Sequence, residues 1–401
     1  MTFSKTDARS VESSKSKSKS KSKSKSKSES EIKNTTDQSQ LPGKLGNPLC
    51  EFSTDYRADP RLVAALAPFG MEGPVELPVS PGSLYQDRLQ WLADTEGMFE
   101  SLFQVLAADV TPVIGVEHCI EVIKGADNND INLHIHRPVD SSVHRSKGNS
   151  GTLPCVYHIH GGGMAMLQAS NPMYGYFRDS LAALGVVVIG VEFRNSGGKL
   201  GSHPFPAGLN DCVSGLQWVF ANKANLGISQ LVLSGESGGG NLALATCLNA
   251  KRINELNLVD GVYAMCPMIF NANNNKSPEY PSQIENDGYF INYPTIQLCA
   301  SLYDPGNTEA ENPLCWPITA SKEDLSGLPP HMISVNEMDI FRDEGLRYYR
   351  NLLTAGVRAS SRTVNGTCHS GDVNFPAAAP DIFAATLSDI YGFTRSLSTT
   401  E

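Results

Sequence analysis

Residues 231–245 read LVLSGESGGGNLALA, in which an apolar run meets a glycine-rich turn and then a second apolar run. Residues 231–233 predict a short buried strand, and residues 241–250 predict an amphipathic helix. The turn between them matches G-x-S-x-G, with Ser237 at its centre. Small flanking residues let a serine hydroxyl stand clear at the carboxyl edge of a sheet. We therefore expect Ser237 to be a nucleophile carried on a strand–turn–helix unit.

A second glycine-rich turn, His160-Gly161-Gly162-Gly163, follows the strand predicted over residues 155–158. Attack by a serine on an ester carbonyl creates an oxyanion, which needs N–H donors already aimed at it. Glycines let the bare backbone approach that oxygen, so we expect donors from Gly161, Gly162 and Gly163, and from Gly238 directly after the serine. A phosphate-binding loop is the alternative for such a turn, but this turn lacks the lysine of a P-loop.

A serine nucleophile also needs a histidine base, which follows it in the chain in this arrangement. Only His331 and His369 follow Ser237. His331 opens the strand predicted over residues 331–335, so it falls at the amino edge of the sheet, away from the nucleophile. His369 comes after the strand predicted over residues 359–364 and a Gly-Thr turn, which places it in a loop at the carboxyl edge. His369 is therefore the predicted base.

The acid that orients this histidine is expected just past the strand that begins at Met332. Asp339 lies there and is the predicted acid. Glu337 and Asp343 are the alternatives, although Asp343 together with Glu344 is expected to cap the helix that follows.

Strands and helices alternate through most of the chain. Short β-rich apolar runs are typical of strands buried on both faces, and the alternation predicts a mostly parallel sheet covered by helices on both faces. The predicted strands are residues 116–123, 131–136, 155–158, 186–191, 231–233, 332–335 and 359–364, and the predicted helices are 208–221, 241–250 and 343–355.

Composition divides the chain into three parts. Residues 1–45, in which Lys and Ser alternate from Lys15 to Ser28, hold too few apolar residues to fold and are expected to be a disordered tail. Residues 46–110 have helical periodicity and are expected to form an N-terminal helical cap. Residues 111–401 are the predicted catalytic domain, in which the Asn-, Pro- and Tyr-rich stretch 267–315 is an insertion that contributes to the cap or the site.

Charge and cysteine content limit the partners and the compartment. The tail carries 11 basic and 5 acidic residues, so the remaining 21 basic and 37 acidic residues give the body a formal charge of −16. Such a body repels nucleic acid and anionic membrane surfaces, and its longest apolar run, residues 181–191, is too short to span a bilayer. Nine cysteines, scattered singly and partly within apolar runs, indicate reduced thiols and a cytoplasmic protein.

Two His-x-His pairs, His134/His136 and His158/His160, would each share one face of a strand. Such a pair is a potential start of a metal site, but no third ligand of suitable spacing follows, and His160 already belongs to the glycine-rich turn. We therefore expect neither a metal nor an organic cofactor.

With these residues identified, the chain resembles the hormone-sensitive-lipase family of α/β-hydrolases over about residues 55–395. It has HGGG at residues 160–163, the elbow pattern at 235–239 and D-x-x-x-D-E-G at 339–345. The resemblance implies the α/β-hydrolase fold, an eight-stranded and mostly parallel sheet with helices on both faces and an N-terminal helical cap. It also implies the triad Ser237, Asp339 and His369, with Gly162, Gly163 and Gly238 as oxyanion donors.

This sequence departs from the family pattern at three places. Glu236 stands for the common Asp, Gly238 stands for Ala, and Cys-His-Ser-Gly at residues 368–371 stands where the family often has H-G-F. The last change alters the wall around the base.

The expected function is hydrolysis of short-chain, acetyl or lactone esters of small molecules by a serine nucleophile. Two alternatives stay open: an amidase or acyltransferase that uses the same residues, and a catalytically silent hydrolase-fold receptor for a small ligand. The presence of all three triad residues argues against the receptor, because such receptors usually lack the histidine. The expected partner is a small-molecule ester or lactone, and a homodimer is compatible with this interpretation.

Overall fold

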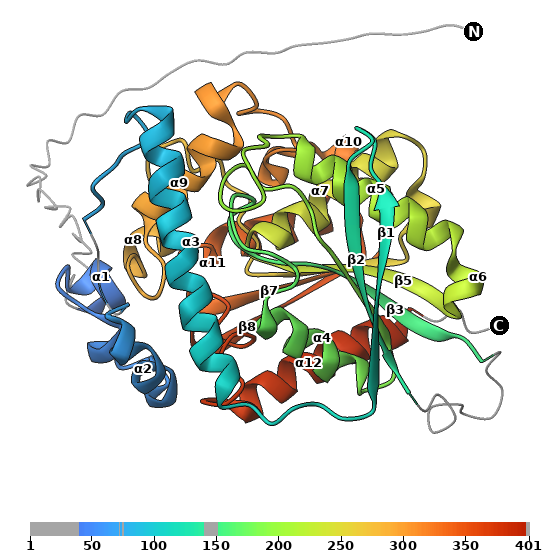
Figure 1. The fold of residues 1–401 in the computed structure, drawn as a ribbon. Coiled ribbons are helices and arrows are strands. Elements are labelled where there is room, and N and C mark those ends of the chain that lie inside the picture. The colour runs from blue at the N-terminus through green and yellow to red at the C-terminus, as the bar shows by residue number, and fades with distance from the viewer. Residues whose placement is uncertain (1–39, 72, 74–75, 140–150, 398–401) are drawn as a thin grey trace, which may run out of the picture.

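An eight-stranded sheet forms the centre of the fold in a computed structural model, which describes residues 40–397 except 72, 74–75 and 140–150 (Figure 1). The strands lie in the order β1-β2-β4-β3-β5-β6-β7-β8. β2 is antiparallel to β1 and β4, and every other neighbouring pair is parallel, so the predicted mostly parallel sheet is confirmed. The strands are β1 Val116–Lys124, β2 Asp130–Pro138, β3 Leu153–Ile159, β4 Val187–Val191, β5 Ile228–Glu236, β6 Gly261–Met265, β7 His331–Met338 and β8 Ala359–Cys368.

Helices cover both faces of the sheet. α4 and α12 lie together on one side, and α5, α7 and α11 pack on the other (Figure 1). The α-helices are α1 Gly43–Gly46, α2 Pro60–Leu66, α3 Tyr85–Ala108, α4 Pro172–Ala182, α5 Ala207–Ala221, α6 Lys223–Leu226, α7 Gly238–Arg252, α8 Ser282–Glu285, α9 Tyr293–Tyr303, α10 Lys322–Leu325, α11 Arg342–Thr354 and α12 Pro380–Ser396.

Side chains along the central strands alternate between two apolar layers. In β3, Tyr157 packs in the layer with α5 and α7, whereas Val156 packs in the layer with α4 and α12. Because both layers exclude water, these strands are apolar on both faces, as parallel strands between helices require. β6 was not among the predicted strands, although all five of its residues are buried between β5 and β7.

Residues 46–110 contain the helices that the periodicity predicted. Asp59 caps α2, because its side chain accepts a hydrogen bond from the Arg61 N–H at 2.9 Å, and Pro60 is the first helical residue. α3 then runs for 24 residues and packs against α4 and α9. Its buried face includes Phe99 and Phe103. The predicted boundaries of cap and catalytic domain stay predictions, and residues 1–39 of the predicted tail lie outside the described residues.

The expected cap of the helix after residue 339 is wrong. α11 has Phe341 at its N-cap, so neither acid occupies that position, and the Asp343 N–H donates to Ser282 Oγ at 3.2 Å. The carboxylate of Asp343 instead accepts the Ser282 N–H at 2.7 Å, and Glu344 accepts the N–H groups of Ile269 and Phe270 at 2.7 and 3.0 Å. Both acids lie in the first turn of α11 but bind backbone N–H groups of the 267–315 insertion.

No helix in the described ranges combines the length and the apolar character that crossing a membrane requires.

A buried ion network joins the N-terminal segment to the insertion. Glu285 accepts two hydrogen bonds from Arg342, at 2.8 and 2.9 Å, and pairs with Arg57. Arg57 also pairs with Asp55 at 2.7 Å. The Glu285 side chain is only 3% exposed, so its charge depends on these two guanidinium groups.

We predict that Glu285→Gln lowers the free energy of unfolding by about 3 kcal/mol, because two partly buried guanidinium groups lose their shared carboxylate. Urea unfolding followed by circular dichroism measures this change. Asp381→Asn is the matched control, since Asp381 pairs with Arg61 at an exposed site, and surface pairs of this kind contribute little. Equal midpoints for Glu285→Gln and the control would contradict the proposed role of the network.

Candidate active site

Ser237 lies at the junction between β5 and α7, as the motif predicted. Its φ of 57° and ψ of −122° are uncommon for a residue with a side chain, so the turn is strained. The backbone around it is pinned: the Ser237 N–H donates to the Met265 carbonyl at 3.0 Å, and the Ser237 carbonyl accepts from Met268 at 3.1 Å. The β6 end therefore holds the serine in position.

His369 and Asp339 meet at the same edge of the sheet. Asp339 follows β7 and His369 follows β8, and these parallel neighbours end side by side. His369 Nδ1 lies 2.9 Å from Asp339 Oδ2, and both residues are buried. The second carboxylate oxygen of Asp339 accepts the Phe341 N–H at 3.0 Å, and the Phe341 ring contacts the imidazole edge-on at 5.1 Å. The histidine ring is thus fixed on one side by a carboxylate and on another by an aromatic ring.

The surroundings of His369 change its pKa in opposite directions. Burial by itself lowers the pKa, because it disfavours the imidazolium. The Asp339 carboxylate outweighs burial through its charge and its hydrogen bond, so the pKa of His369 is raised well above its ordinary value.

The alternative acids and the alternative histidine lie elsewhere. Glu337 accepts the Gly366 N–H at 2.8 Å, and Asp343 binds the insertion as described above. His331 begins β7, and its Nδ1 lies 2.7 Å from the Pro329 carbonyl oxygen. Burial lowers the pKa of His331 to about 4. Of the candidates weighed from the sequence, only Asp339 contacts His369 among the described residues.

A cavity of about 60 Å³ brings Ser237, His369 and the glycine-rich turn after β3 together. Within this turn the Gly161 N–H donates to Glu236 Oε1 at 2.7 Å, so this predicted oxyanion donor is already paired inside the protein. Among the described residues, the Gly162 and Gly163 N–H groups donate to no backbone carbonyl. Gly162 has a φ of +111°, and a Cβ there would lie 2.1 Å from the Met166 carbonyl oxygen, so only glycine fits.

Glu236 is a residue whose role the sequence did not reveal. It occupies the variable position of the elbow motif, and its buried carboxylate bridges two elements: Oε1 binds the Gly161 N–H, and Oε2 lies 2.9 Å from His158 Nε2. The carboxylate thereby ties the end of β5 to the glycine-rich turn. The signal available in the sequence was an acid beside the serine together with a histidine near the end of the strand before the glycine-rich turn.

Glu192 contacts the segment that follows the glycine-rich turn and lies near His160 at the start of the turn. Glu192 Oε1 accepts the Ala169 N–H at 2.7 Å and lies 3.6 Å from His160 Nε2. Burial favours the neutral acid, but the His134 and His160 imidazoles, 3.8 and 3.6 Å from the carboxylate oxygens, and the Ala169 N–H prevail and lower the pKa of Glu192 to about 2. The carboxylate is therefore ionised at neutral pH.

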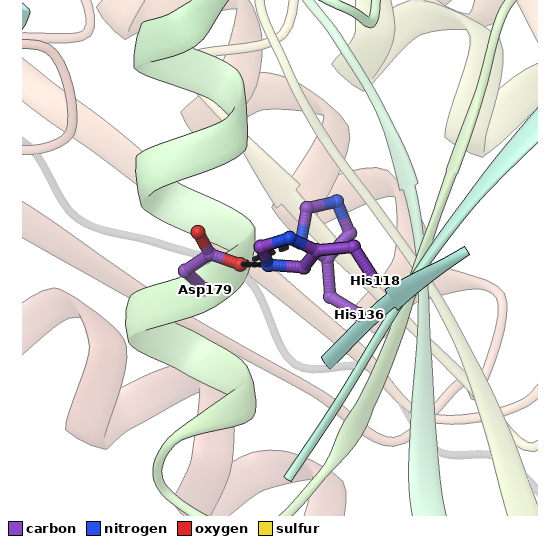
Figure 2. Close-up of side chains that lie close together, drawn as sticks. All are labelled: His118, His136 and Asp179. Carbon is purple, nitrogen blue, oxygen red and sulfur yellow. Dashed lines mark hydrogen bonds and ion pairs between the residues drawn. The ribbon is translucent and has the colours of Figure 1, made fainter. Parts of the chain in front are cut away.

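The His134/His136 pair does not form a shared site, but His136 joins a different cluster. His118 from β1, His136 from β2 and Asp179 from α4 point toward one another (Figure 2). His118 Nε2 and His136 Nδ1 lie 2.5 and 2.7 Å from the same Asp179 oxygen. The sequence showed no third potential ligand near the histidine pair. In the structure, Asp179 from α4 takes that place beside His118 and His136.

A fourth residue determines the character of this cluster. Arg178 Nε–H donates to His136 Nε2 at 2.8 Å, which requires a lone pair on that nitrogen and therefore a proton on Nδ1. The Nδ1–H then donates to Asp179. A metal at Nδ1 would need the opposite tautomer, with two donors facing each other, so the donor set fits a hydrogen-bond network that ties β1 and β2 to α4 better than a metal site.

Comparisons with known proteins agree with this geometry. A family model described as the alpha/beta hydrolase fold matches residues 156–371. Brefeldin A esterase, described as a bacterial homologue of human hormone-sensitive lipase, is 38% identical with a TM-score of 0.82, over 89% of this chain and 98% of its own. The esterase Est22 is 37% identical with a TM-score of 0.75, over 86% of this chain and 99% of its own. The resemblance to the hormone-sensitive-lipase family is confirmed.

Curated relatives point the same way. Carboxylesterase NlhH of Mycobacterium tuberculosis is 29% identical over 251 residues, which cover 61% of this chain and 74% of that protein. An arylesterase of Saccharolobus solfataricus is 30% identical over 244 residues, covering 59% of this chain and 74% of that protein.

We predict that Glu236→Ala lowers kcat for p-nitrophenyl acetate by about tenfold to a hundredfold, because the turn that carries the expected oxyanion donors loses its buried anchor. KM should change little, since the lost contact does not touch the substrate. Glu236→Asp is the conservative control and should retain most of kcat. Steady-state kinetics with a thermal unfolding curve for each variant measures this, and a wild-type kcat in Glu236→Ala would contradict the anchoring role.

Proposed function

This chain belongs to the α/β-hydrolase fold family and is an ester-hydrolysing enzyme, and we propose that Ser237, His369 and Asp339 are its catalytic triad. The observation that carries the proposal is that Ser237 and His369 line one cavity while Asp339 holds the far nitrogen of the imidazole. The strained backbone of Ser237 supports it, because such strain is typical of a nucleophile elbow.

The proposed reaction has two halves. Ser237 Oγ attacks the ester carbonyl while His369 Nε2 takes the hydroxyl proton, and the oxyanion is bound by the N–H groups of Gly162, Gly163 and Gly238. When the tetrahedral intermediate collapses, the bond to the alcohol breaks and His369 gives its proton to the departing oxygen. Water then attacks the acyl-serine with the same base, and the acid leaves with Ser237 restored.

Asp339 has two effects in this scheme. Its hydrogen bond to Nδ1 keeps the imidazole in the tautomer that presents a lone pair at Nε2, and its charge stabilises the imidazolium that forms. Gly161 is not needed as a donor, because its N–H is already paired with Glu236.

We further propose that the substrates are short-chain, acetyl or lactone esters of small molecules. The cavity beside Ser237 has a volume of about 60 Å³, and apolar side chains from α3 and from the insertion, including Phe99, Phe103 and Phe290, form much of its wall. A cavity of this size and polarity favours a compact apolar group over a long chain.

The cysteines support a reducing compartment, and we propose the cytoplasm. All nine fall within described residues as free thiols, and only Cys119 is exposed. Free and mostly buried thiols are typical of a protein that works in a reducing compartment.

We predict that a fluorophosphonate probe labels Ser237 in the wild type and that Ser237→Ala abolishes both labelling and ester hydrolysis. The melting temperature should stay close to that of the wild type, since only one hydroxyl is removed. Peptide mapping by mass spectrometry identifies the labelled residue. Labelling of another residue in the wild type, with Ser237 unmodified, would refute the triad.

We predict that kcat/KM falls as the pH is lowered, with a midpoint above the ordinary histidine value of about 6.5. The base must be neutral to accept the serine proton, and a raised pKa keeps His369 protonated up to a higher pH. A pH series on p-nitrophenyl acetate gives the midpoint, with residual activity measured after return to neutral pH as the stability control. A reversible acid limb centred below 6 would contradict the assigned pairing with Asp339.

A further inference from the structure

Two cavities lie side by side beneath the helical cap. The small cavity, of about 60 Å³, contains Ser237 and His369, and a large cavity, of about 340 Å³, lies against Phe69, Trp91 and Met98. Four residues line both cavities: Phe99, Phe290, Ile291 and Thr295. The wall between the two spaces is therefore made by side chains from α3, from the start of α9 and from the segment just before it.

Two rings form the body of that wall. Phe99 from α3 and Phe290 from the insertion meet edge to face, with centroids 6.0 Å apart and an interplanar angle of 82°. Phe290 makes a second edge contact with Phe375 at 5.7 Å. Phe99 is 8% exposed and Phe290 is 5% exposed, so both rings are packed rather than lying in solvent. We call this pair the aromatic partition.

The backbone of Phe290 supplies an independent observation. Its φ is +72°, in the left-handed region that bulky side chains rarely adopt. Neighbouring contacts hold it there: the Phe290 N–H donates to the Met71 carbonyl at 3.0 Å, and the Gly288 N–H donates to the Ile291 carbonyl at 3.0 Å. Strained residues of this kind persist where the surroundings fix them, and they gather at ligand sites. Here the strain places a ring between the catalytic cavity and the space beyond it.

Resting on the proposed function of Ser237, we propose that the aromatic partition determines which esters the enzyme accepts. It closes the catalytic cavity against the larger one, so that one apolar arm of the substrate is limited to a few carbons. The large cavity is lined by Trp91, Phe69 and Met98 and would accept a longer alkyl or aryl arm once a ring is removed.

Apolar contact explains the size of the expected effect. Each methylene that leaves water for an apolar cavity gains roughly fourfold in binding. In the wild type, a substrate chain that reaches the partition gains no binding free energy from further carbons. Longer chains bind more weakly because they clash with the two rings. Without one ring, several more methylenes reach apolar walls, and the gain multiplies with length.

The test compares two single-ring variants with the wild type. Phe290→Gly removes the ring and suits the left-handed backbone, so it should fold, and Phe99→Ala opens the same wall from the α3 side. Met98→Ala is the matched control, because Met98 lines only the large cavity and is 53% exposed. The substrates are p-nitrophenyl esters from C2 to C12 and, in parallel, acetate esters of alcohols of increasing length.

In the wild type and in Met98→Ala, kcat/KM should fall at least about tenfold between C4 and C10. In Phe290→Gly and Phe99→Ala, the ratio of kcat/KM for C10 to kcat/KM for C2 should rise at least about tenfold over the wild-type ratio. A gain in the acyl series places the acyl chain in the large cavity, and a gain in the alcohol series places the alcohol there; both support the partition.

An unchanged length profile in both ring variants, with their melting curves cooperative and Ser237 still labelled by a fluorophosphonate, would overturn the partition and leave the triad standing. Absence of labelling at Ser237 in the wild type would instead overturn the proposed function itself, so the two failures are distinguishable.

Discussion

Close approach of two glycine-rich turns is the constraint on which the candidate active site depends. β3 and β5 are parallel neighbours in which Ile159 pairs with Gly235, so the turns that follow them lie side by side. A Cβ atom on Gly239 would lie 1.9 Å from the Ile159 carbonyl oxygen, and one on Gly238 would lie 2.8 Å from the Gly163 nitrogen. The nucleophile turn and the proposed oxyanion turn thus meet at backbone distance, which no residue with a side chain permits.

Turns built from glycine have no side chains to hold them, and two carboxylates, one buried and one partly buried, stabilise this part of the chain instead. Glu236 accepts the Gly161 N–H within the turn, and Glu192 accepts the Ala169 N–H beyond it. A histidine lies beside each carboxylate, at 2.9 Å from Glu236 and 3.6 Å from Glu192. Burying an ionised carboxylate is costly unless a charge and hydrogen bonds compensate. Arg178, buried among them, provides that charge: burial lowers its pKa only to about 10, so it is still protonated at neutral pH. The position of the glycine-rich turn therefore depends on the charged side chains of Glu236, Glu192 and Arg178.

The sequence predicted the parts of this molecule that depend on local pattern. Apolar runs located seven of the eight strands, and parallel pairing then put the ends of β7 and β8 at one edge, where Asp339 contacts His369. The sequence did not predict hydrogen bonds whose two partners come from segments far apart in the chain. The Gly161 N–H binds Glu236 from another strand, and the acids of α11 bind the insertion rather than their own helix. Likewise, Asp179 joins His136 only because α4 packs on β2.

The same division separates the proposed triad from the proposed substrate-selecting wall. Ser237, Asp339 and His369 each follow a strand of the same sheet, so sheet geometry positions them, and short motifs in the chain reveal them. The sheet does not position the walls of the cavity in this way. Phe99 comes from α3, which precedes β1 in the chain, and Phe290 comes from an insertion between β6 and β7. They meet only in the folded chain, and one of them needs a strained backbone to do so. Changes in these segments can therefore alter which ester fits without moving the residues at the sheet edge, because the two sets share a cavity but no strand.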